Sequence, residues 1–195
     1  MLERRGLTGE GAEIGVREGI YAKDILLGWP SCKKLHLIDP WCELPKEEYQ
    51  DERTFDPEWY DRCWQRMRDF NEQVAFWSMT SKDACKRFAQ YETPISILYS
   101  RNTWQLPPTL DFVYVDANHG YEHVRDDCFG WWERLSNNGV LAGHDIFNPK
   151  CPGVTQAVLE FCQHHKRIAH IVPGDLDQHG KLIVEHSWYI FKGDG

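Results

Sequence analysis

The sequence lacks the features that would place it in a membrane or among secreted proteins. It has no run of about 20 apolar residues, the length that a transmembrane helix needs. The segment from Met1 to Gly6 lacks the apolar core of a signal peptide. The seven cysteines are an odd number without a C-x-x-C pair, which favours reduced thiols. We therefore expect a cytoplasmic protein without a membrane partner.

Positive charge is also scarce. The chain has 22 Lys and Arg against 30 Asp and Glu, which gives a formal net charge of −8 at pH 7. Surfaces that bind nucleic acids need clustered Lys and Arg to neutralise phosphates. The composition therefore argues against a nucleic-acid partner.

The length and composition fit one globular domain. With 195 residues, of which 42% are hydrophobic and 27% charged, the chain is long enough to bury a single core. It contains no internal repeat and no low-complexity segment. We expect a single domain over residues 1–195.

Short apolar runs alternate with segments of helical periodicity, and this alternation predicts the fold. The expected strands are residues 11–16, 33–40, 74–79, 111–116, 140–145, 168–174 and 181–191. The best helical stripe runs from Val154 to Cys162. The final two strands have a short connection, which can only join them antiparallel. The pattern predicts a doubly wound α/β fold, with a mostly parallel seven-stranded sheet, helices on both faces and a C-terminal antiparallel hairpin.

Capping residues predict where the helices begin and end. Asp56 before Pro57 predicts a helix start, and Ser81 is the expected cap of a short helix. Residues 137–139, Asn-Asn-Gly, predict the exit of the helix that carries Trp131. Residues 91–110 fit either an extra strand or a packed loop.

Residues that suit a ligand follow the first two strands. Glu13, Gly15 and Gly19 surround the first strand end, but Arg17 stands where the dinucleotide fingerprint G-x-G-x-x-G has its middle glycine. Asp39 ends the second strand, where a carboxylate can accept hydrogen bonds from ribose hydroxyls. The pattern thus disfavours a dinucleotide oxidoreductase but keeps a nucleoside-like ligand in view.

Several sequence blocks together resemble a known family. They are "EIGVREG", "LIDPW", "TSKDACKRF", "LDFVYVDANHGYEHV", "WWERLSNNGVLAGHD" and "PGVTQAVLEF". The chain resembles the class I S-adenosylmethionine-dependent methyltransferases from Glu13 to Lys192, and within them the subgroup called methyltransferase domain 24. The resemblance implies a Rossmann-like methyltransferase fold and methyl transfer to a small-molecule acceptor, with a hydroxyl as the expected acceptor group.

The resemblance also implies roles for individual residues. Glu13, Gly15 and the backbone from Arg17 to Gly19 would seat the methionine part of S-adenosylmethionine. Asp39 would hold the ribose, while Pro40 or Trp41, and Thr80 and Ser81, would lie near the adenine. Asp116 would face the methyl-transfer centre. The implied cofactor residues are Glu13, Gly15, Arg17, Gly19, Asp39, Trp41, Ser81 and Asp116.

Metal assistance is a further implication, and three alternatives stay open. Asp116 and Asp145 offer hard oxygen ligands for Mg²⁺ or another divalent cation, with water or His144 completing the set. His144 or His119 could instead act as a general base without a metal. In the third alternative the turn at His144 is structural. The catalytic candidates are thus Asp116, His119 and His144, and the metal candidates are Asp116, His144 and Asp145.

The stretch His119-Gly-Tyr-Glu122-His123 matches the zinc-hydrolase motif H-x-x-E-H. A zinc hydrolase needs both histidines inside one helix, whereas Gly120 interrupts the turn and a strand directly precedes it. We expect His119 and Tyr121 at the mouth of the site and Glu122 at the helix start. A zinc hydrolase and a catalytically silent S-adenosylmethionine-binding module are the alternative functions. The sequence also leaves a homo-oligomer open.

Overall fold

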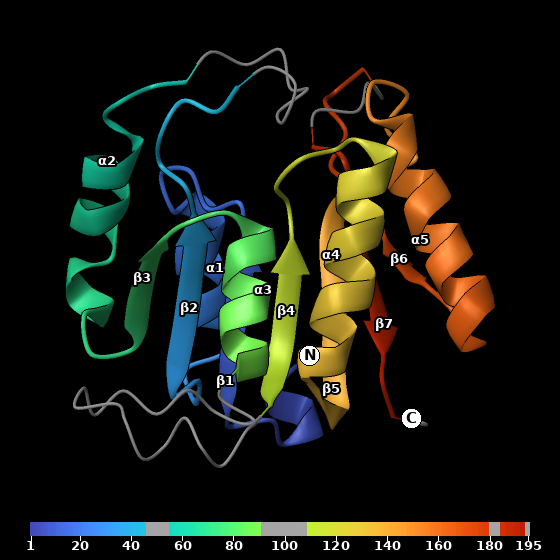
Figure 1. The fold of residues 1–195 in the computed structure, drawn as a ribbon, viewed down its shortest axis with the longest axis horizontal. Helices are drawn as coiled ribbons and strands as arrows, with labels where there is room; N and C mark the ends of the chain where they lie inside the picture. Colours follow the sequence, from blue (N-terminus) through green and yellow to red (C-terminus); the bar gives the residue numbers. More distant parts are fainter. Residues whose placement is uncertain (46–54, 91–108, 180–183, 194–195) are drawn as a thin grey trace.

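The computed structural model describes residues 1–45, 55–90, 109–179 and 184–193. Within these ranges a mixed sheet is sandwiched between helices (Figure 1). The strands are β1 (Glu10–Ile14), β2 (Lys34–Asp39), β3 (Val74–Ser78), β4 (Leu110–Val115), β5 (Leu135–Ile146), β6 (His170–Val172) and β7 (His186–Phe191). The helices are α1 (Ile20–Gly28), α2 (Trp59–Arg66), α3 (Ser81–Gln90), α4 (Tyr121–Arg134) and α5 (Pro152–His165), with short 3₁₀ turns at Glu3–Arg5 and Arg68–Phe70.

The sheet of the described chain has seven strands in the order β3-β2-β1-β4-β5-β7-β6. β1 to β5 are parallel, while β7 runs antiparallel to both β5 and β6. This confirms the predicted doubly wound fold and its C-terminal antiparallel pair. The strand order reverses between β1 and β4, and open α/β sheets bind ligands at the carboxyl ends of the strands at such a point.

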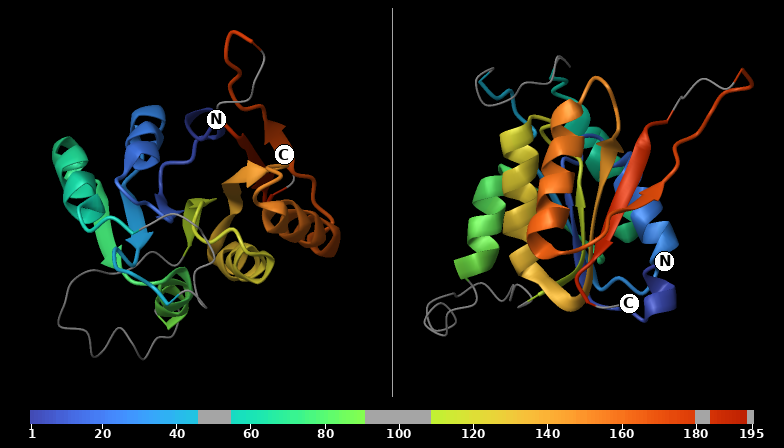
Figure 2. Two further views of the ribbon diagram at one scale, coloured as in Figure 1. Left: turned by 90° about the horizontal axis from the view of Figure 1, so that it is seen from above. Right: turned by 90° about the vertical axis from the view of Figure 1, so that its right-hand side faces the viewer.

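Helices cover the two faces unequally. α3, α4 and α5 line one face, and α1 and α2 lie on the other, over the half of the sheet that contains β1 to β3 (Figure 2). Each face has its own apolar core: Trp131, Phe161 and Trp188 belong to the first, and Leu26, Trp29 and Leu37 to the second. No helix in the described ranges is both long and apolar enough to span a bilayer.

Helix boundaries are where the sequence predictions need correction. α2 begins at Trp59, because the Asp56 carboxylate accepts a hydrogen bond from the Glu58 amide and closes a turn ahead of the helix. Thr80, not Ser81, caps α3, since its hydroxyl accepts from the Asp83 amide at 3.2 Å. The predicted cap of α2, Asp56, lies two residues before the observed N-cap Glu58, and the predicted cap of α3, Ser81, lies one residue after Thr80.

The exit from α4 was also predicted wrongly. β5 begins at Leu135, directly after α4, and includes the Asn-Asn-Gly segment 137–139 that was expected as a loop. The register between β4 and β5 is interrupted between Leu110 and Phe112, and this irregularity accommodates the early strand start. Most of residues 91–110, which fit either an extra strand or a packed loop by sequence, lie outside the described residues.

Candidate functional site

Gly15 forms the tight junction between the ends of β1 and β4. Its φ of +86° lies in the left-handed region, and a Cβ there would lie 2.2 Å from the Asp116 carbonyl oxygen. The Gly15 amide donates to the Ile38 carbonyl and the Asp116 amide donates to the Ile14 carbonyl, so three strand ends are joined here. Glycine is therefore required for close backbone approach at the edge of the sheet.

Asp39 fixes the loop that follows β1. Its Oδ2 accepts hydrogen bonds from the amides of Val16 (3.0 Å) and Arg17 (2.9 Å). Its Oδ1 accepts from the amide of Trp41 at 2.8 Å, and the Trp41 indole donates to the Arg17 carbonyl. The carboxylate predicted to hold a ribose thus also shapes the loop after β1, a role that the sequence did not reveal.

Glu13 is a buried carboxyl beside this loop. Its side chain is 1% exposed, and Oε2 has no hydrogen-bond partner among the described residues. Burial, followed by the neighbouring charges of Asp116 and Asp39, raises the pKa of Glu13 well above its ordinary value. A buried, unpaired acidic oxygen suits a cationic ligand, because such a ligand would relieve the cost of burying it.

Three other predicted cofactor residues, Arg17, Gly19 and Trp41, lie in the loops after β1 and β2. Gly19 has φ of +71° and precedes α1, while Arg17 places its guanidinium over the Trp59 ring at 4.6 Å. Trp41 packs against Tyr60 and Phe76, and these aromatic rings stand beside the loop after β2.

Ser81 lies apart from these residues. Its hydroxyl donates to Asp127 and accepts from the Trp131 indole, within the interface of α3 and α4. Its predicted adenine contact remains a prediction, as do the assigned roles of the other site residues.

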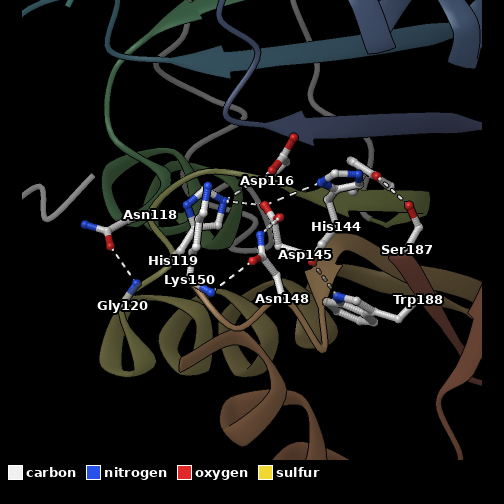
Figure 3. A network of polar contacts seen from close by, with 11 residues as sticks. Asp116, Asn118, His119, Gly120, His144, Asp145, Asn148, Lys150, Ser187 and Trp188 are labelled. Atoms are coloured by element: carbon white, nitrogen blue, oxygen red, sulfur yellow. Dashed lines mark hydrogen bonds and ion pairs between the residues drawn. The ribbon is translucent and has the colours of Figure 1, made fainter. Parts of the chain in front are cut away.

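A network of acids and histidines occupies the carboxyl ends of β4 and β5 (Figure 3). Nε2 of His119 lies 3.0 Å from Oδ2 of Asp145 and 3.4 Å from Oδ1 of Asp116. Nδ1 of His144 lies 3.4 Å from the same Asp145 oxygen. The structure therefore brings together all four residues that the sequence proposed for catalysis and metal binding.

Asp145 is held in place by its own turn. It has φ of +60°, a left-handed conformation that few residues other than glycine, asparagine and aspartate adopt readily. Nδ2 of the Asn148 side chain donates to Asp145 Oδ1 at 2.6 Å. The backbone N–H of Asn148 donates to the backbone carbonyl oxygen of Asp145. Asn148 is a functional neighbour that the sequence reading missed, because no pattern links it to Asp145.

Hydrogen bonds between the histidines and the carboxylates determine the pKa values in this network. Burial opposes the positive charge of His119, but hydrogen bonds to Asp116 and Asp145 outweigh it and raise the His119 pKa to about 9. The hydrogen bond to Asp145 raises the pKa of His144. Burial alone would raise the pKa of Asp145, but hydrogen bonds from His119, His144 and Asn148 hold it far below its ordinary value. At neutral pH, without an ion, His119 is the counter-charge of two carboxylates.

The H-x-x-E-H motif is divided between two elements. His119 lies in the connection between β4 and α4, whereas Glu122 and His123 lie in the first turn of α4. Among the described residues, the groups with metal-ligand spacing include His119 but neither Glu122 nor His123. This geometry argues against the zinc-hydrolase alternative.

A cleft opens on the face of the sheet that α1 covers only in part. It has a volume of about 480 Å³, and Tyr21, Tyr114 and Tyr189 line it together with Asp24 and Glu185. We call it the tyrosine cleft. The rings of Tyr21 and Tyr114 lie 4.1 Å apart, and the Tyr114 hydroxyl is 3.3 Å from Ser187 Oγ. Trp188, which also lines the cleft, donates from its indole to the His144 carbonyl oxygen at 3.3 Å (Figure 3). The cleft thus adjoins the network.

The comparison with protein families resolves the class of the protein. A family model described as a methyltransferase domain matches residues 12–146, well over half of the chain. The chain belongs to this methyltransferase family. The resemblance to class I enzymes and to methyltransferase domain 24 is confirmed, and with it the enzyme class of S-adenosylmethionine-dependent methyltransferase.

Solved structures share the fold of this methyltransferase. An O-methyltransferase from Bacillus cereus, in complex with SAH, has a TM-score of 0.62 at 12% identity; the match covers 98% of this chain and 77% of that one. The O-methyltransferase TomG from Streptomyces achromogenes, in complex with SAM, has a TM-score of 0.60 at 12% identity, with coverages of 98% and 76%.

The fold does not by itself select the acceptor atom. The N-methyltransferase NodS from Bradyrhizobium japonicum WM9 has a TM-score of 0.58 at 14% identity, with coverages of 99% and 93%. No curated protein matches the sequence. The acceptor of this methyltransferase has to be inferred from its own site.

Proposed function

We propose that the protein transfers a methyl group from S-adenosylmethionine to a hydroxyl of a small molecule, assisted by a divalent cation at Asp116, His144 and Asp145. One observation carries the proposal. One ligand atom from each of these three residues lies within 4.8 Å of the others, at the strand ends beside the Gly15 junction. Two carboxylate oxygens suit Mg²⁺ or Mn²⁺, and the imidazole of His144 adds a ligand that favours a transition metal such as Mn²⁺.

The cofactor residues fit a cationic nucleoside ligand. The unpaired Oε2 of Glu13 offers an acceptor, and Gly15 leaves the backbone without a side chain at the sheet edge. The backbone from Arg17 to Gly19 would seat the methionine part, with Asp39, Trp41 and Ser81 toward the nucleoside. When bound, S-adenosylmethionine supplies a methyl group already activated by the sulfonium.

The protein's own residues then have to position the acceptor and remove its proton. Asp116, His144 and Asp145 would hold the divalent ion, and a bound ion would lower the pKa of the acceptor hydroxyl. His119 Nε2 lies within 3.4 Å of both carboxylates, and a bound ion would replace it as their counter-charge, so that His119 could release its proton and then accept one from the acceptor hydroxyl. Asn148 keeps Asp145 in its left-handed conformation throughout.

The tyrosine cleft is the proposed acceptor site. Its described lining contains aromatic rings and the acids Asp24, Asp175 and Glu185, but no Lys or Arg. Aromatic walls suit planar rings and sugars. The acidic lining favours neutral or cationic acceptors over anionic ones.

Transfer of isotope-labelled methyl groups tests the function. Metal-stripped protein is incubated with labelled S-adenosylmethionine and a panel of hydroxylated rings and sugars, with and without Mg²⁺ or Mn²⁺. We expect label in neutral or cationic acceptors and none in anionic counterparts, and we expect EDTA to abolish transfer.

Asp145→Asn tests the ion site, and the ion dependence of the wild type separates the metal from the general-base mechanism. Asparagine accepts the left-handed conformation of Asp145 but removes the charge, so the variant should fold and lose ion-dependent transfer. Asp126→Asn, an exposed change on α4, is the matched control. Ion-independent transfer by the wild type would instead support His119 or His144 as base. Cofactor binding with no transfer to any acceptor would support the silent binding module.

A further inference from the structure

A second group of metal-ligand atoms overlaps the first. His119, Asp145 and Cys151 each offer one ligand atom, and all three atoms lie within 4.8 Å of one another. They come from three places in the sequence: the connection after β4, the end of β5 and the residue before α5. Only Asp145 is shared with the group that contains Asp116 and His144.

Backbone packing holds this second group together. The Cys151 amide donates to the Asn148 carbonyl at 3.0 Å, and the Asn148 side chain holds Asp145, so one turn carries both ligands. A Cβ on Gly153 would lie 2.7 Å from the His119 carbonyl oxygen, which shows how closely the first turn of α5 packs on the His119 segment. The proximity of Cys151 to His119 is therefore built into the fold.

The ligand types of the two groups differ. Mg²⁺ takes oxygen ligands and binds thiolates poorly, whereas imidazole, carboxylate and thiolate together suit Zn²⁺. Zn²⁺ sites with three protein ligands and a fourth, open position are common in proteins. Asp145 is 6% exposed, and both partners are half-buried, so the three ligands are already partly withdrawn from water.

We propose that His119, Asp145 and Cys151 form a zinc site that excludes the ion at Asp116, His144 and Asp145. His119 and His144 both face Oδ2 of Asp145, while Oδ1 accepts a hydrogen bond from Asn148, so the two ions compete for one oxygen and only one of them binds at a time. Zinc would also draw His119 away from Asp116. The site makes the protein responsive to zinc, and it uses the first histidine of H-x-x-E-H with partners other than Glu122 and His123.

Direct metal binding tests the proposal independently of methyl transfer. Metal-stripped wild type is titrated with Zn²⁺ by calorimetry, and with Co²⁺ while the near-ultraviolet sulfur-to-cobalt charge-transfer band is recorded. We expect the band in the wild type and its loss in Cys151→Ser. Zinc affinity of that variant should fall by more than the roughly 10- to 100-fold that removal of an outer-shell partner costs.

Cys85→Ser is the matched control, since Cys85 is also a half-buried thiol, on α3 and outside the ligand group. It should keep the wild-type band and affinity. Circular dichroism and thermal unfolding report whether each variant is folded. Absence of the band in the wild type, or an equal loss of zinc affinity in both variants, would overturn the site.

A measurement on the wild type covers the case in which Cys151→Ser does not fold. Alkylation of each cysteine is followed by mass spectrometry in the presence of Zn²⁺ or Mg²⁺. Zinc should protect Cys151 and magnesium should not, while equal labelling of Cys151 under both conditions would contradict the proposal. Inhibition of methyl transfer by zinc is a further consequence that rests on the proposed function, whereas binding and protection do not.

Discussion

At the residue scale, Asp39 joins an observed structural role to a proposed role in ligand binding. It accepts three backbone hydrogen bonds that shape the loop after β1, and it lies where a ribose is expected. We predict that Asp39→Ala weakens binding of S-adenosylhomocysteine by about 1–3 kcal/mol, because the amides of Val16 and Arg17 lose their acceptor. Calorimetry of the variant, with the exposed Asp61→Ala as control, measures this; equal affinities would remove Asp39 from the site.

Asp127 gives a second prediction at this scale, on stability. Burial raises its pKa from 3.8 to about 7, against the lowering effect of the Ser81 hydrogen bond. Between these pH values the folded protein binds more protons than the unfolded chain, so this carboxyl lowers the free energy of unfolding as pH rises. Asp127→Asn removes that penalty while keeping an acceptor for Ser81.

The free energy of unfolding of the variant should therefore rise relative to that of the wild type between about pH 4 and 7, by up to about 4 kcal/mol. Above about pH 7 the difference should stay constant. Urea unfolding at several pH values measures the difference. A difference that does not depend on pH would contradict the raised pKa of Asp127.

Residues that lie at strand ends could be predicted from the sequence to meet in one site. Asp116, His144 and Asp145 come directly after β4 and at the end of β5, so their meeting follows from strand order alone. The bond of Ser81 to Asp127 depends on how α3 packs on α4, and the approach of Cys151 to His119 depends on how α5 docks. Neither leaves a local signal in the sequence.

At the element scale, the junction of β1 with β4 depends on one glycine. Gly15→Ala would place a methyl group 2.2 Å from the Asp116 carbonyl oxygen at a φ of +86°. Backbone strain and overlap together should cost about 2–4 kcal/mol. Binding of S-adenosylhomocysteine should be lost as well, because Asp116 shifts with the strand end.

Gly28→Ala is the control for this prediction. Gly28 ends α1, and an added Cβ would meet nothing within 4 Å, so alanine should raise stability by about 0.5–1 kcal/mol. Thermal unfolding of both variants makes the comparison. Similar effects in the two would show that the Gly15 junction is not tightly packed.

Periodicity predicted the presence of the strands and helices more accurately than the residues at which they begin and end. The buried strand β4 and the helix α5 carry continuous apolar patterns, which tertiary packing preserves. Ends depend on single hydrogen bonds, such as the Thr80 cap on α3, and two adjacent hydroxyl residues, Thr80 and Ser81, give the same sequence signal.

At the scale of the whole molecule, topology creates the site. The reversal of strand order between β1 and β4 places the loop after β1 and the acid–histidine network at the carboxyl ends of the strands, and the tyrosine cleft lies on the adjoining sheet face beside α1. Alternation of strands and helices predicts this arrangement. The tyrosine cleft was not predicted, because it results from how little of one sheet face α1 and α2 cover in the described chain.

The cofactor site is tested by calorimetric titration of the metal-stripped protein with S-adenosylhomocysteine, repeated with Mg²⁺, Mn²⁺ and Zn²⁺. We expect micromolar binding that Mg²⁺ or Mn²⁺ alters and that Gly15→Ala abolishes. A folded protein that shows no binding under any of these conditions would contradict the assignment of a cofactor site to the ends of β1 and β2.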